Sequence, residues 1–257
     1  MRTAIAACAA WAWMVLSLAA APPAGAGFLL TFSGASDSQT PARMSIEKEA
    51  LRIEEGGNVA IYRRDKNLLW SLNSREKTYT ELTHQQAEKV GKDMGKAMEG
   101  LREQMKDLSP EERKLMEGMM GEALKKHSAP SKVEYRKIAS NARAGKWTCD
   151  RYEMLVDGRK KAETCFARAA SIGVDPPEAQ TLESFFAFMS KTAKQMGAVF
   201  GVFQGSEPPG IPVETVSFSE DKASERMEVQ EIARKSFPGS LFEVPEGYRK
   251  EEMGPGR

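Results

Sequence analysis

The sequence predicts an α+β protein in which inserted helices cover one face of a mostly antiparallel sheet. Three observations predict this class. The hydrophobic period changes from about two residues to between three and four and back again along the chain. Turn signals such as Gly56-Gly57-Asn58 and Asp157-Gly158 separate short β-prone runs. The resulting order of strands, helices, strands, one helix and strands is typical of a single α+β domain.

The first 26 residues have the layout of a secretory signal peptide. Arg2 is followed by an apolar run from Ala4 to Leu18, and then by the small-x-small sequence Ala24-Gly25-Ala26. We therefore expect cleavage after Ala26 and a mature domain covering residues 27–257. The apolar run is too short for a stable membrane span, and no second one follows. The mature chain is thus expected to be periplasmic or secreted, with no transmembrane segment.

Residues 28–82 are predicted to form an antiparallel meander. The expected strands are Phe28–Ser33, Met44–Ile53, Val59–Arg63, Leu68–Leu72 and Lys77–Thr80. The second of them is irregular, because Met44 and Ile46 share one parity while Leu51 and Ile53 share the other. Either a β-bulge lies between the two pairs, or the two ends of the strand are not both half-buried.

A helical hairpin is predicted as an insertion at residues 83–128. Its first helix carries one apolar stripe at a spacing of three or four residues, formed by Val90, Met94, Met98, Leu101, Met105 and Leu108. Ser109-Pro110 starts the second helix, with Ser at the cap and Pro at the first helical position. A further helix begins at Asp175-Pro176 by the same capping logic, and Phe185 and Met189 lie on its apolar side.

Strands are predicted again at Val133–Ile138, Trp147–Tyr152, around Cys165-Phe166, and at Pro212–Ser219, Glu225–Ala233 and Leu241–Val244. Cys149 and Cys165 form an even pair in an exported chain, which predicts a disulfide. A two-residue Asp157-Gly158 turn would place Cys165 on the wrong face. The disulfide therefore predicts a three-residue turn, Val156-Asp157-Gly158, that sets the two cysteines opposite each other.

The composition argues against two classes of function. Removal of Arg2 leaves 36 of the 37 Lys and Arg residues against 36 Asp and Glu residues, so no basic excess indicates a nucleic-acid partner. The chain has 2 histidines and lacks the HExxH and GxSxG motifs and a Gly-rich phosphate loop. We expect no catalytic residues, no cofactor and no metal. Bridged cysteines cannot act as nucleophiles, so the protein is predicted not to be an enzyme.

A ligand cavity between the sheet and its helices is the best-supported kind of site. An aromatic sheet face covered by Met- and Phe-rich helices can hold an apolar ligand, although a filled core fits the same pattern. The candidate lining residues are Trp70, Leu72, Met94, Met98, Phe185 and Met189. The methionines allow one other interpretation, because thioethers suit Cu(I) in an exported protein. They share their stripe with aliphatic residues, which favours a packing face.

Three stretches together resemble an exported bacterial family known as domain of unknown function 4412. They are Leu68–Asn73 with Glu76–Glu81, Gly145–Tyr152 with Cys165, and Gly210–Glu214 leading to Leu241–Tyr248. The resemblance covers roughly residues 28–250, and the closing Phe-Glu-Val-Pro-Glu-Gly-Tyr is its most specific part.

That family is similar to periplasmic lipoprotein carriers and outer-membrane lipoprotein receptors. The resemblance implies an incomplete β-barrel with helical lid elements and an apolar cavity for acyl chains. We therefore expect non-catalytic binding of an apolar or amphipathic ligand, such as a lipid, an acyl chain or a lipoprotein tail. Two alternatives remain: an envelope interaction or stress-related module that uses the exposed Met-rich hairpin to dock a protein partner, and a Cu(I)-binding protein.

Overall fold

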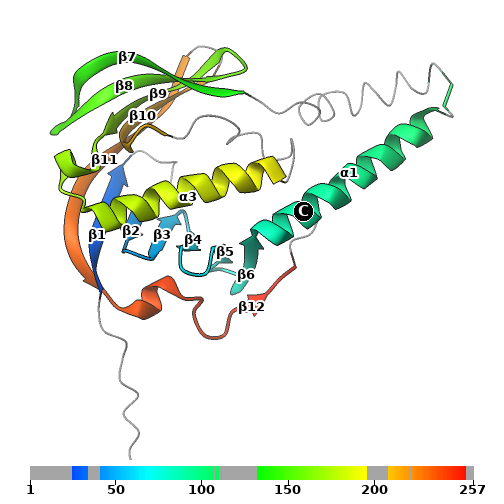
Figure 1. Cartoon of the computed structure of the whole chain (residues 1–257), viewed down its shortest axis with the longest axis horizontal. Coiled ribbons are helices and arrows are strands. Elements are labelled where there is room, and N and C mark those ends of the chain that lie inside the picture. The colour runs from blue at the N-terminus through cyan, green and yellow to red at the C-terminus, as the bar shows by residue number, and fades with distance from the viewer. Residues whose placement is uncertain are drawn as a thin grey trace, which may run out of the picture.

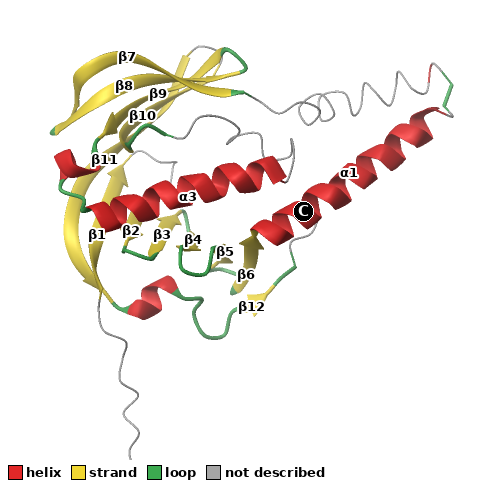
Figure 2. Ribbon diagram, in the orientation of Figure 1, coloured by secondary structure: helices red, strands yellow, loops and turns green. Residues whose placement is uncertain are grey.

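The computed structural model describes residues 25–33, 41–106, 108–109, 111, 132–195, 208–219 and 222–252. These residues form one open sheet of 12 strands in the order β12-β6-β5-β4-β3-β2-β1-β11-β10-β9-β8-β7, together with the α-helices α1 and α3 (Figures 1 and 2). Neighbouring strands are antiparallel except for β12 and β6, which run parallel. The α+β class and the mostly antiparallel sheet are therefore as predicted.

The first half of the sheet is a meander of six strands. They are β1 (Gly25–Ser33), β2 (Ala42–Ile46), β3 (Ala50–Glu55), β4 (Asn58–Arg63), β5 (Leu68–Asn73) and β6 (Thr78–Thr83). The predicted single strand Met44–Ile53 is wrong, because a tight turn divides it into β2 and β3. The Glu47 amide donates to the Ala50 carbonyl at 2.8 Å, and the charged residues at 47–49 form the turn. That turn, and not a bulge, explains the parity break.

The second half contains β7 (Val133–Ala144), β8 (Trp147–Val156), β9 (Arg159–Ala167), β10 (Ile211–Ser219) and β11 (Lys222–Phe237). β11 pairs with β1, so segments from the two ends of the described chain join the halves into one sheet. The last strand, β12 (Arg249–Lys250), adds to β6 at the other edge. The predicted strand at Leu241–Val244 is wrong, because a short 3-10 helix, η3 (Gly239–Phe242), occupies part of it.

The disulfide between Cys149 and Cys165 is present, with 5.5 Å between the two Cα atoms. The predicted three-residue turn is wrong. Asp157 and Gly158 both have positive φ and form a two-residue turn, so Val156 lies opposite Arg159. A register shift between Met154 and Leu155 then moves the strands by one residue. This shift brings both cysteines to one face, where they form a diagonal pair.

The two helices start with recognisable capping signals. α1 (His84–Lys106) begins after Thr83, whose hydroxyl accepts from the Gln86 amide at 3.2 Å while the Gln86 side chain accepts from the Thr83 amide at 2.8 Å. α3 (Pro176–Gln195) follows Asp175, as predicted. Residues 1–24, most of the second helix of the predicted hairpin, and the end of the third predicted helix lie outside the described residues. In the described part, no helix combines the length and the apolar character that a membrane span needs.

Apolar side chains pack on both faces of the sheet. The larger cluster lies on the face that α3 covers and includes Leu30, Ile46, Leu51, Tyr62 and Phe188. The smaller cluster lies on the opposite face under the C-terminal segment, and includes Ile61, Trp70, Leu72, Phe237 and Phe242. In Figure 1, β1–β6 and β7–β9 lie on opposite sides of α3. Apolar side chains pack on both faces of β4 and β5. The alternation of apolar residues along these strands therefore does not show which face the helix contacts.

Candidate binding site

Three rows of side chains cross strands β3–β6 on the face that α3 covers. The register aligns Leu51, Tyr62, Leu69 and Leu82 in the first row, Ile53, Ala60, Ser71 and Thr80 in the second, and Glu55, Asn58, Asn73 and Thr78 in the third. Polarity thus rises from the first row to the third, toward the turns that join these strands. Leu51 and Tyr62 in the first row are buried, Ser71 in the second is exposed, and Glu55 and Asn58 in the third are exposed while Thr78 is buried.

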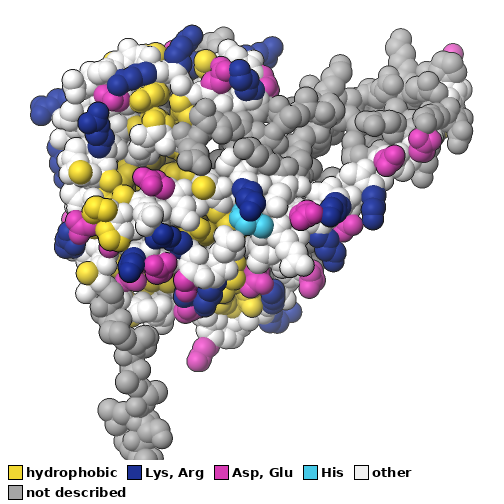
Figure 3. Space-filling view, viewed as in Figure 1, with side chains coloured by type: hydrophobic (Ala, Val, Ile, Leu, Met, Phe, Trp, Pro, Cys, Tyr) yellow, Lys and Arg dark blue, Asp and Glu magenta, His cyan; other side chains and the backbone are white. Residues whose placement is uncertain are grey.

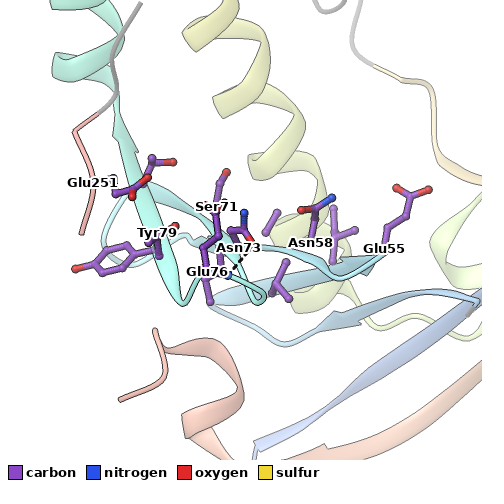
Figure 4. A pocket seen from close by; sticks show the side chains of 14 residues that line it. Glu55, Asn58, Ser71, Asn73, Glu76, Tyr79 and Glu251 are labelled. Carbon is purple, nitrogen blue, oxygen red and sulfur yellow. Dashed lines mark hydrogen bonds between the residues drawn. The ribbon is translucent and has the colours of Figure 1, made fainter. Parts of the chain in front are cut away.

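The second and third rows form the floor of an open pocket of about 630 Å³ (Figure 4). On this face its apolar side chains are Ile53 and Ala60, and its polar groups come from Asn58, Ser71, Asn73, Thr78 and Thr80. Val59 and Leu72 also line it, although their side chains are buried in the cluster on the opposite face. The lining is completed by Glu55, Gly56, Glu76, Tyr79 and Glu251. In Figure 4, Ser71, Asn58 and Glu55 rise from the sheet on one side, while Tyr79 points away from them.

The geometry of the rim is fixed by the strand ends. The Asn73 side chain accepts hydrogen bonds from the backbone amides of Arg75 and Glu76 at 3.0 and 3.2 Å, which closes the β5–β6 turn. The Glu251 amide donates to the Tyr79 carbonyl at 2.8 Å, so the C-terminal segment supplies the outer edge. The polar end of the pocket is therefore built from turns and from a paired backbone segment.

α3 closes the apolar end of this arrangement. Tyr62 packs against Phe185 and Phe188, with ring centroids 5.6 and 5.4 Å apart. Its hydroxyl lies 2.7 Å from the Ser184 hydroxyl, and burial, the largest influence, raises the pKa of Tyr62. Tyr62 thus remains a neutral hydrogen-bonding partner that holds α3 over the first row.

The six predicted lining residues do not form one surface. Phe185 and Met189 pack against the cluster under α3. Trp70 and Leu72 belong to the cluster on the opposite face, where the Trp70 indole donates to the Glu81 carboxylate at 3.0 Å. Leu72 also lines the pocket described above, although its side chain packs in this cluster on the opposite face. The sheet therefore separates Trp70 from the two α3 residues.

Met94 and Met98 lie in α1, but their side chains are outside the described part of the structure. The Cu(I) alternative, which depends on these two side chains, stays a prediction. In the described part of the chain, no three His, Cys, Asp or Glu side chains gather at metal-binding distances.

Sequence reasoning did not select Ile53, Ala60, Ser71 and Thr80. None of these four residues carries distinctive chemistry, and they come from four separate strands. The turn signals could have revealed them, because fixing the β3–β4, β4–β5 and β5–β6 registers aligns the four positions in one row. The spacing of the turns was therefore more informative than residue type.

The described chain is thus an α+β protein with an extensive open sheet and a pocket that is apolar at one end and polar at the other. No family model matches the chain, and no curated protein matches it. Among solved structures, that of PNGF-II in space group C2 is similar, with a TM-score of 0.43 and 8% sequence identity. The match covers 89% of this chain and 31% of the PNGF-II chain, so this chain spans about a third of that protein.

Proposed function

We propose that this protein is an exported, non-catalytic binding protein for an amphipathic ligand. The observation that carries the proposal is the polarity gradient on strands β3–β6, where an open pocket adjoins the helix-covered apolar row. An acyl chain or a similar apolar tail would lie over Ile53 and Ala60 beside α3. A polar head would face the Asn and Glu side chains at the turns.

Two further features support this proposal. The arrangement of the sheet on both sides of α3 fits an incomplete β-barrel with a helical lid, the plan implied by the resemblance to lipoprotein carriers. The Cys149–Cys165 disulfide fits an oxidising compartment, as the predicted signal peptide requires. The ligand class is then a lipid, an acyl chain or a lipoprotein tail.

A blocking substitution tests the pocket. The variant Ser71→Trp would fill the second row, and we expect it to weaken binding of dodecyl maltoside, measured by titration calorimetry, by at least about tenfold, or 1.4 kcal/mol. Thr80→Trp is a second blocking variant in the same row. Ser140→Trp, on the exposed part of β7, is the matched control and should bind as the wild type does.

The proposal fails if the wild type does not bind the detergent, or if the blocking variants bind as tightly as the control. If the detergent does bind at this pocket, native mass spectrometry of protein purified from its host envelope would identify the natural ligand. A bound species that carries an acyl chain, and that Ser71→Trp loses, is the expected result.

A second candidate function rests on α1. The helix projects away from the sheet (Figure 1), and both basic and acidic side chains lie along its described part (Figure 3). Lys89, Lys92 and Lys96 are all exposed, which favours docking of an envelope protein along this helix. Replacing these three lysines with Glu should abolish co-purification of such a partner while leaving detergent binding unchanged. Co-purification that persists in the variant would exclude this use of the helix.

A further inference from the structure

A buried carboxyl oxygen of Glu47, in the β2–β3 turn, has no hydrogen-bond partner among the described residues. The atom is Oε1. Burial, followed by the nearby charge of Glu178, raises the pKa of Glu47. Glu178 stands in the first turn of α3, is only 7% exposed, and its own buried Oε2 likewise has no partner among the described residues. Buried carboxyl oxygens without donors are costly, so this corner of the fold is short of a hydrogen-bond donor.

Gly27 lies directly against Glu47. A Cβ atom added at Gly27 would lie 3.0 Å from Glu47 Cγ and 2.3 Å from the Ile46 carbonyl oxygen. The position therefore excludes every side chain, and only the backbone of residue 27 can approach the Glu47 side chain. The predicted cleavage point is the peptide bond between Ala26 and Gly27. Cleavage there would leave Gly27 with a free α-amino group, whose ordinary pKa of about 7.7–8.0 makes it mostly protonated at neutral pH.

We propose that removal of the leader completes this corner, because the new α-ammonium group of Gly27 pairs with the Glu47 carboxylate. Water adds across the Ala26–Gly27 peptide bond, so Ala26 leaves with a carboxylate and Gly27 gains the amine, which takes up a proton. The ammonium supplies both the charge and the donors that Glu47 lacks. The inference rests on the exported, processed chain assumed by the proposed function, but not on ligand binding.

Several cations lie near this turn. The Arg64 guanidinium donates to the Lys48 carbonyl at 3.3 Å and Arg63 lines a pocket with Glu47, but neither charge is among the causes that shift the pKa of Glu47. Lys235 is opposite Gly27 on β11, and its side chain is exposed. It makes no ion pair with Glu47 among the described residues, and its charge is not among the causes that shift the pKa of Glu47. Cleavage itself would remove little of the sheet, because only Gly25 and Ala26 precede Gly27 in β1.

The pairing would also fix α3. The Thr181 hydroxyl donates to the Lys48 carbonyl in the same turn, so the start of the helix is already attached beside Glu47. An unpaired Glu47 charge repels Glu178 and loosens this attachment, whereas a paired one does not. Removal of the leader would thus stabilise the attachment of α3 to the β2–β3 turn.

The test compares two exported proteins. One is the wild type, and the other has Gly-Asn inserted between Ala26 and Gly27, which moves the ammonium by two residues, or about 6.6 Å, without adding charge. Intact mass defines where each chain starts. Each protein is then studied with Glu47→Gln, and with Glu49→Gln as the matched control, since Glu49 is exposed in the same turn.

We expect the sign of the effect to reverse between the two proteins. In the chain that starts at Gly27, Glu47→Gln should lower the melting temperature by about 2–4 °C because an ion pair is lost. In the extended chain it should raise the melting temperature because an unpaired buried charge is removed. The Glu49→Gln control should have the same small effect in both. The reversal should also persist in Lys235→Gln backgrounds.

A second measurement uses the wild-type start alone. Reductive ¹³C-methylation followed by NMR titration should give an α-amino pKa above 8 that falls to the ordinary value in Glu47→Gln. The proposal is overturned if the mature chain starts elsewhere than Gly27. It is also overturned if Glu47→Gln changes the melting temperature in the same direction in both proteins, or if the α-amino pKa is the same with and without Glu47→Gln. Since none of these readouts involves a ligand, they leave the binding proposal to its own test.

Discussion

The imidazole ring of His84 lies against the phenyl ring of Phe188, with 4.6 Å between the ring centroids. His84 is the first residue of α1 and Phe188 is in the middle of α3, so this contact joins the two described helices. The His84 Nδ1 also lies 3.3 Å from the Thr192 hydroxyl. His84, a titratable residue, therefore contacts α3, the helix that covers the sheet.

Stability should therefore depend on the protonation of His84. Burial is the largest cause and the charge of Lys191 the second, and together they lower the pKa of His84 below its ordinary 6.5. The unfolded chain then binds the proton more tightly than the folded one. This contribution to stability is complete above pH 6.5 and is lost as the pH falls through the folded pKa. Melting temperatures of the wild type and His84→Gln, measured from pH 8 to 5, should converge as the pH falls. A constant difference would contradict this assignment.

The Tyr62 hydroxyl should contribute measurably to the attachment of α3. Tyr62 is 1% exposed and its hydroxyl lies 2.7 Å from the Ser184 hydroxyl. Tyr62→Phe keeps the ring contacts but removes this bond, so we expect the free energy of unfolding to fall by about 1 kcal/mol in urea titrations. Ser184→Ala is the partner variant. A double-mutant cycle should show that the two losses are not additive, and strict additivity would mean that the hydroxyls do not interact.

Arg151 should matter more than Arg226 to the buried carboxylate of Glu214. The Glu214 side chain is 3% exposed and contacts the Arg151 guanidinium at 2.8 Å and that of Arg226 at 2.5 Å. Arg151 is 23% exposed and Arg226 is 61% exposed, so solvent screens the second pair far more. We expect Arg151→Met to cost about 1.5–3 kcal/mol of unfolding free energy, as for a hydrogen bond to a charged group. Arg226→Met should cost under about 1 kcal/mol. Equal costs, measured by denaturant unfolding, would show that burial does not set the ranking.

The strand order was predictable where turn residues are distinctive. Gly56-Gly57 and Asp157-Gly158 do form turns, and positive φ at both residues of each pair explains why the chain reverses there. The β2–β3 turn escaped detection because it is made from charged residues that are equally common in exposed strands. Its presence was visible only as the parity change between Ile46 and Leu51. Strand register, unlike strand existence, depends on one-residue shifts that residue types do not reveal.

The candidate site was predicted only in part, for a related reason. The alternation along β5 predicts a heavy apolar face that contains Trp70 and Leu72, but that face packs against Phe242 and not under α3. Burial drives large apolar residues to either face when both are covered, so size does not identify the face that holds a ligand. Phe185 and Met189 pack against the apolar cluster under α3, while their role in lining a ligand cavity stays a prediction. The residues that form the pocket floor became visible only when the register aligned them.

The Cys149–Cys165 disulfide should stabilise the β8–β9 hairpin against unfolding. The two residues are separated by 16 positions, and Cys165 is fully buried while Cys149 is 4% exposed. In the chain-entropy model, a loop of this size is worth about 3 kcal/mol. We expect the double variant Cys149→Ala with Cys165→Ala to lose about that amount in denaturant unfolding. Reducing agent should destabilise the wild type and leave the double variant unchanged. If reduction affects neither protein, the two thiols are not bridged in the folded chain.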